Sequence, residues 1–111
     1  MKIFFGAILM LVLAASGGRA DGTSEFERIL DEHGGGIAST NGVYVAGLAY
    51  CKLDYKAGVE AYKLRLEMTS KDASATWRRM IRAAKSSLKE MRDTKMTCDD
   101  DIKNRLTRKT F

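Results

Sequence analysis

The residues with the widest chemical scope in this chain of 111 residues are two cysteines, Cys51 and Cys98, and a single histidine, His33. Two cysteines in an oxidising compartment favour a disulfide, whereas a redox site usually carries a Cys-x-x-Cys pair, which this sequence lacks. The bridge would enclose 46 intervening residues. The chain-entropy relation for such a loop gives a stabilisation of about 4 kcal/mol. The sequence therefore predicts one structural disulfide between Cys51 and Cys98.

The other candidate catalytic and metal-binding residues are few. His33 stands before three glycines, where a capping role at a helix end is favoured over acid–base chemistry. One histidine cannot build a structural zinc site when both cysteines are bridged. The run Asp99, Asp100 and Asp101 lacks the alternating oxygen ligands and the glycine of a calcium loop, and is typical of a helix start. We therefore expect no enzyme, no cofactor and no bound metal.

A row of cations with helical spacing is the most informative polar feature. Its steps of 4, 3, 4 and 3 place it on one face of a helix, beside the apolar face. Such a surface could contact lipid phosphates or an acidic protein. Nucleic acid is disfavoured, because no ladder of aromatic residues alternates with the cations. We call this row the basic stripe; it consists of Arg78, Arg82, Lys85, Lys89 and Arg92.

The stripe also has a simpler interpretation, in which its charges are solvated or paired within the chain. The segment 21–33 carries five carboxylates against Arg28 alone and could lie over the stripe. The residues concerned are Asp21, Glu25, Glu27, Asp31 and Glu32.

The first elements that must position these residues are a short helix and a long one. Ser24 followed by Glu27 is the pattern of a capping box, and it predicts a helix that runs to His33. Residues 34–42 are predicted as a flexible connector. From 43 to 68 the apolar residues form two lines on opposite sides, which indicates one central helix packed by neighbours on both sides.

The rest of the chain predicts a second long helix and a short terminal one. Trp77 begins the apolar face of the long helix, with Ser70 or Asp72 as its cap, and Thr97 is a candidate cap for the last helix. The two long helices should be antiparallel about a turn at 70–72. The midpoint of the two cysteines, 74.5, lies within about one helical turn of that centre. The predicted fold class is all-α: a small helical bundle with a long antiparallel pair, short N- and C-terminal helices and one disulfide.

The first twenty residues have the pattern of a secretory signal peptide. After Lys2, residues 3–15 form an uncharged apolar run of thirteen residues. This run is shorter than the roughly 20 residues that span a bilayer, and it matches a signal core. Cleavage before Asp21 would leave residues 21–111 as a single helical domain without a transmembrane segment. We expect a secreted or periplasmic protein.

Part of the mature chain resembles the small exported helical modules related to bacterial lysozyme inhibitors. The resemblance is carried by Cys51, Tyr62, Leu66, the run 91–93 and Cys98. It departs from that pattern because Trp77 lies fifteen residues before Arg92, rather than just before the Arg-Asp pair. The resemblance implies inhibition of a secreted hydrolase, such as lysozyme, as one alternative function.

From the residues themselves we expect a non-enzymatic interaction protein of the cell envelope or the extracellular space. Its partner would be a protein or an anionic envelope component that contacts the basic stripe. A further alternative is a periplasmic stress chaperone that exposes its Met- and Tyr-rich faces when acid protonates the carboxylates.

Overall fold

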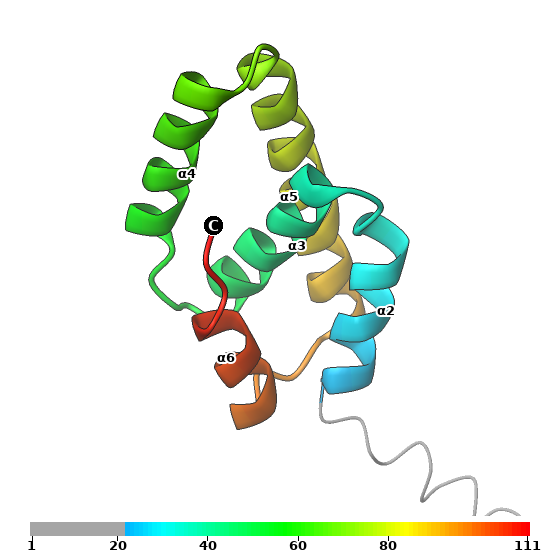
Figure 1. The fold of residues 1–111 in the computed structure, drawn as a ribbon. Helices are drawn as coiled ribbons and strands as arrows, with labels where there is room; N and C mark the ends of the chain where they lie inside the picture. Colours follow the sequence, from blue (N-terminus) through cyan, green and yellow to red (C-terminus); the bar gives the residue numbers. More distant parts are fainter. Residues whose placement is uncertain (1–21) are drawn as a thin grey trace, which may run out of the picture.

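The computed structural model describes residues 22–111, which form five helices and no strand (Figure 1). This confirms the all-α class, and the predicted disulfide between Cys51 and Cys98 is present. The predicted leader, residues 1–20, and the predicted cleavage before Asp21 lie outside the described residues. The helices are α2 (Thr23–His33), α3 (Ile37–Tyr50), α4 (Lys56–Thr69), α5 (Ala73–Thr94) and α6 (Asp100–Thr107).

Helix α3 is the centre of the bundle, because its sequence is apolar on nearly every side. A helix of this kind must be covered all round, and α3 packs against α5, α2 and α6. A close contact with α5 is at Gly42, where an added Cβ would lie 2.4 Å from the carbonyl oxygen of Met80 and 2.9 Å from the amide nitrogen of Ala84. The backbones of α3 and α5 therefore meet directly at this glycine.

Helices α3 and α5 run in the same direction. Gly42 faces Met80 and Ala84, near the middle of α5, while Cys51 at the end of α3 is bonded to Cys98 beyond the end of α5. The antiparallel pair about the turn at 70–72 is instead α4 with α5 (Figure 1). The cysteines thus meet because two parallel helices end at the same place, and not because they mirror one another across a hairpin.

The single helix predicted over 43–68 is wrong, since the chain breaks between α3 and α4. Lys52 adopts a left-handed conformation with φ of 58°, and the N–H of Leu53 donates to the carbonyl oxygen of Leu48 at 2.8 Å. This closes α3 with a Schellman-type cap. The side chain of Asp54 then accepts from the N–H of Lys56 at 3.2 Å and begins the next helix.

The predicted connector over 34–42 is also too long, because α3 begins at Ile37. Ala38, Asn41 and Gly42 are buried, so packing against α5 outweighs the weak helix propensity of this polar stretch. Only residues 34–36 connect α2 to α3, and the hydroxyl of Thr40 donates to the carbonyl oxygen of Gly34 at 2.9 Å across this connection.

Two predicted helix caps lie at other residues. Gly22, and not Ser24, occupies the N-cap of α2, with φ of 94° and its Cα against the backbone of Thr97. A side chain there would be strained and would have no space. At α6 the cap is Asp99 rather than Thr97, because the Asp99 carboxylate accepts from the N–H of Ile102 at 2.8 Å.

Helix α5 ends on Lys95 in a left-handed conformation with φ of 54°. The N–H of Met96 donates to the carbonyl oxygen of Met91 at 3.0 Å, and both of these side chains are buried. This is the hydrogen bond and the apolar contact of a Schellman cap.

Because glycine adopts this conformation without a steric penalty, we expect Lys95→Gly to raise the free energy of unfolding by about 1 kcal/mol. Urea unfolding of the oxidised chain measures the change, with Lys71→Gly as a control for loss of a lysine. A destabilised Lys95→Gly variant would contradict this account of the cap.

The core is divided into two clusters that α3 joins. The larger contains Phe26, Ile29, Met91, Ile102 and Leu106, and it ties α2, α5 and α6 together. The smaller gathers around Tyr62 and Met80, and it attaches α4 to α3 and α5.

Tyr62 is the one buried residue of α4, so this helix is held less extensively than the others. Within residues 22–111, no helix has the length and apolar character needed to cross a membrane.

Candidate binding surface on α5

The structure places all five residues of the basic stripe on the exposed side of α5. From Arg78 to Arg92 the stripe covers fourteen residue steps, a length of about 21 Å along the helix. The same helix buries Met80, Ser87 and Met91 on its opposite face. A single amphipathic helix, fixed by its apolar side against α3, therefore presents the cations to solvent.

Beside the first three cations the surface is hollowed, with a volume of about 460 Å³. Trp77 and Ile81 are half-buried and form its apolar part. Arg78, Arg82 and Lys85 complete the lining. An anionic group that also carries an apolar portion could thus contact both kinds of side chain.

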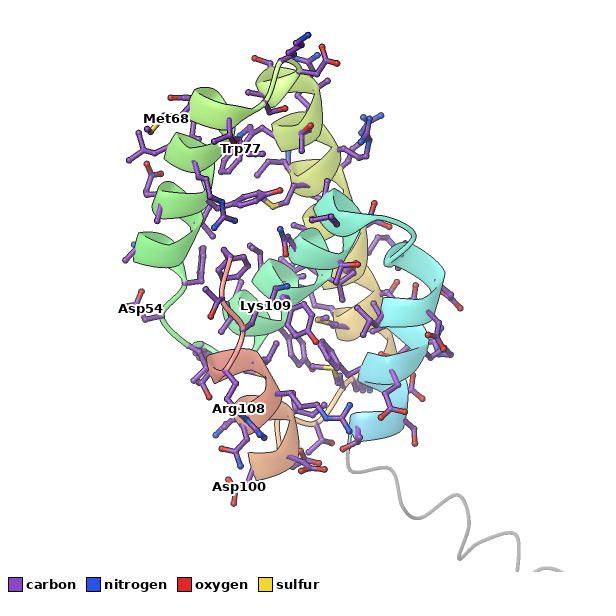
Figure 2. The ribbon with its side chains drawn as sticks, viewed as in Figure 1. Asp54, Met68, Trp77, Asp100, Arg108 and Lys109 are labelled. Carbon is purple, nitrogen blue, oxygen red and sulfur yellow. A yellow bond between two sulfur atoms is a disulfide. The ribbon has the colours of Figure 1, made fainter. Side chains whose placement is uncertain are left out.

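Trp77 projects from α5 towards α4 (Figure 2). The ammonium of Lys63 lies 5.4 Å from the centre of the indole ring, which adds a cation–π contact between the two helices. Trp77, Lys63 and Arg78 also border a second, smaller hollow of about 160 Å³. The aromatic side chain is thereby fixed between two hollows, whereas its helical spacing predicts only a core position. Its position one residue before Arg78 is the sequence feature that could have indicated a place beside the basic stripe.

Most cations of the stripe form no ion pair with a carboxylate of the described residues. In the described part of the chain, the only ion pair that the stripe makes joins Lys89 to Asp93 at 2.7 Å. The hydrogen bond that the Lys89 ammonium donates to the Asp93 carboxylate raises the pKa of Lys89 above its ordinary value. All three cations that border the hollow, Arg78, Arg82 and Lys85, are therefore without a carboxylate partner among the described residues.

The acidic residues of α2 do not pair with the stripe, although α2 does pack on α5. Glu25 and Glu32 pair with Arg28 of their own helix, each at 3.0 Å. Glu27 reaches Arg105 of α6 at 2.9 Å. Among the described residues, the carboxylates of α2 thus do not neutralise the stripe, and three of them pair with Arg28 or Arg105 instead; Asp21 lies outside the described residues.

Helices α2 and α5 are instead joined through one carboxylate of α5, that of Glu90. It accepts from Arg28, and its other oxygen lies 3.2 Å from Nε2 of His33. The hydrogen bond from Arg28, followed by that from His33, holds the pKa of Glu90 below its usual range. The hydrogen bond between Arg28 and Glu90 also raises the pKa of Arg28. His33, predicted to cap a helix end, is the last residue of α2, and its ring contacts Glu90 of α5.

The other candidate functional residues stabilise the fold. Cys51 and Cys98 are bonded, half-buried and packed against the larger core cluster. Asp99 caps α6, while Asp100 and Asp101 are exposed in its first turn, where negative charge complements the helix dipole. Of these groups, the basic stripe with its hollow is therefore the strongest candidate for a binding surface.

Comparisons of the chain with protein-family models, with curated proteins and with solved structures return no match.

Proposed function

We propose that this chain is a small, exported, non-enzymatic binding protein whose α5 surface binds an anionic partner. The observation that carries the proposal is the exposed group Arg78, Arg82 and Lys85 beside the half-buried Trp77 and Ile81. Cations next to an aromatic and an aliphatic side chain suit a partner that offers carboxylates or phosphates together with an apolar group.

The proposal includes export of the protein from the cytosol. The Cys51–Cys98 disulfide supports it, because such bonds persist mainly outside the cytosol. The predicted signal sequence in residues 1–20 supports it as well. Mass spectrometry of the natural protein should find Asp21 as the first residue and both cysteines oxidised, and an intact leader with two free thiols would contradict it.

Charge reversal tests the binding surface. The triple variant Arg78→Glu, Arg82→Glu, Lys85→Glu should lose at least tenfold in affinity, because three attractive contacts become repulsive. The probes are vesicles of anionic and of neutral lipid, and the natural extract of envelope or secreted proteins. Affinity should fall as salt rises, since exposed charges are screened beyond about 10 Å at 0.1 M.

A matched control separates the stripe from net charge alone. The variant Lys56→Glu, Lys71→Glu, Lys103→Glu changes the charge by the same amount at exposed sites on other elements. It should bind nearly as well as the parent chain. Equal affinity of the stripe variant and the parent for every probe would overturn the proposed function, and binding to anionic vesicles alone would identify lipid as the partner.

A stress chaperone is the second candidate, and the outer face of α4 favours it. Leu64 is 59% exposed and Met68 is 83% exposed. Met68 points away from the bundle (Figure 2). An apolar row of this kind could hold an unfolded client. Suppression of aggregation of a model client at low pH, lost in Leu64→Ser, Met68→Ser but kept in the stripe variant, would distinguish this role from the first.

A further inference from the structure

Three side chains with metal-binding atoms meet where the end of α2 contacts α5. Glu32, His33 and Glu90 bring one donor atom each within 4.8 Å of one another. Nε2 of His33 lies 3.2 Å from Oε2 of Glu90 and 3.9 Å from Oε2 of Glu32. Around a tetrahedral zinc ion with bonds of 2.0–2.1 Å, ligand atoms are about 3.3 Å apart. The His33–Glu90 pair already has this separation, and Oε2 of the exposed Glu32, at 3.9 Å from His33, would have to move closer on binding.

Arg28 orients the two carboxylates. It donates to Oε1 of Glu90 and to Oε1 of Glu32, the second bond being 3.0 Å. Each carboxylate therefore uses one oxygen for Arg28 and keeps the Oε2 atom on the side of His33. Metal sites commonly have this second layer, in which a hydrogen-bonding group outside the ligands fixes their direction.

The charge of the group matches a divalent cation. Arg28 contacts three carboxylates, those of Glu25, Glu32 and Glu90. Counted over Arg28 and these three carboxylates, without Arg79 and Arg82 of the neighbouring hollow, the group carries two negative charges. A divalent ion would cancel both.

The same place opens onto a hollow of about 460 Å³. Glu32 and His33 line it together with Ser39, Arg79 and Arg82. A cation held by the three side chains would therefore have an open side towards solvent, next to two arginines that attract anions. Three protein ligands with one open position is the usual arrangement of zinc sites that bind water or a further ligand.

We propose that Glu32, His33 and Glu90 bind a divalent transition-metal ion; one imidazole nitrogen and two carboxylate oxygens suit zinc, which is the ion we test. The ion would link α2 to α5, and its open position would accept water or a small anion in the hollow.

Isothermal titration of the oxidised full chain with zinc chloride tests the proposal. We expect one saturable site. His33→Gln should weaken it at least tenfold, and Glu90→Gln by a similar factor, because loss of even an outer group commonly costs 10–100-fold. The matched control is Glu27→Gln, which removes a carboxylate of α2 that pairs with Arg105 outside the group. Its affinity should stay within twofold of the parent.

His33→Gln keeps the test valid if Glu90→Gln loosens the contact between the helices. The side chain of His33 is 24% exposed, and the Arg28–Glu90 ion pair does not include His33, so we expect the pair to persist in His33→Gln. Far-ultraviolet circular dichroism checks the fold of each variant. Cobalt(II) supplies a second readout, since a tetrahedral site gives strong visible absorption, which His33→Gln should abolish. Absence of a saturable zinc site, or equal affinity in the parent and His33→Gln, would overturn the proposal.

Discussion

Replacing Cys51 and Cys98 together with serine should lower the free energy of unfolding by about 4 kcal/mol. The two residues are 47 apart, and removing the bond releases a loop of this length in the unfolded chain. Domains of this size have a total stability of roughly 5–15 kcal/mol. At about 4–8 °C for each kcal/mol, the midpoint of thermal unfolding should fall by roughly 20 °C.

Urea unfolding followed by circular dichroism measures this effect. The parent chain in excess reductant should match the double serine variant, because both lack the bond. A loss below 1 kcal/mol in both would show that the parallel ends of α3 and α5 are held by packing alone, which would contradict the predicted role of the disulfide.

The second large effect is expected at Gly42. In Gly42→Ala the new methyl carbon would lie 2.4 Å from the carbonyl oxygen of Met80 and 2.7 Å from Cβ of Ala83. Two of its nearest atoms belong to the backbone of α5, so relief requires the helices to separate. Overpacking usually costs 1–3 kcal/mol, and we expect about 3 kcal/mol here because a rigid helix blocks relaxation.

Gly35→Ala is the matched control for this change. An added Cβ at Gly35 has nothing within 4 Å, so its effect should stay within about 0.5 kcal/mol. Chemical unfolding of the two oxidised variants gives the comparison. Equal stability of Gly42→Ala and Gly35→Ala would mean that α3 and α5 do not approach as closely as the structure shows.

Much of the fold could be predicted because its signals are local. The apolar face of α5, the turn at 70–72 and the acidic start of α6 each follow from residues three or four positions apart in the sequence. The break between α3 and α4 could not be found in this way. Leu53 and Tyr55 keep helical spacing, yet they pack on the core from a non-helical link. The spacing of apolar residues does not reveal that Lys52, just before them, adopts a left-handed conformation and ends the helix.

The start of α3 was missed for the opposite reason. Residues 39–42 read Ser-Thr-Asn-Gly, a typical connector, but the absence of a side chain at Gly42 is what lets α5 pack so closely. Tertiary contact outweighed local propensity.

The candidate site shows the same division. Spacing along one helix correctly placed the basic stripe on one exposed face, because that pattern is local. It could not show that Glu90 would meet His33, which is 57 residues away, or that Glu27 would reach Arg105 across 78. Those contacts depend on how α2 and α6 pack in the fold. The number of charges in each segment does not show which residues will meet.

The position of α4 within the disulfide loop has a consequence for proteolysis. This helix has one buried residue, and its basic residues Lys56, Lys63 and Arg65 are exposed, so a trypsin-like protease would cut it before the other long helices. Every such cut lies between Cys51 and Cys98. The two fragments therefore remain one covalent molecule, with the α3–α5 contact still in place, and they separate only after reduction.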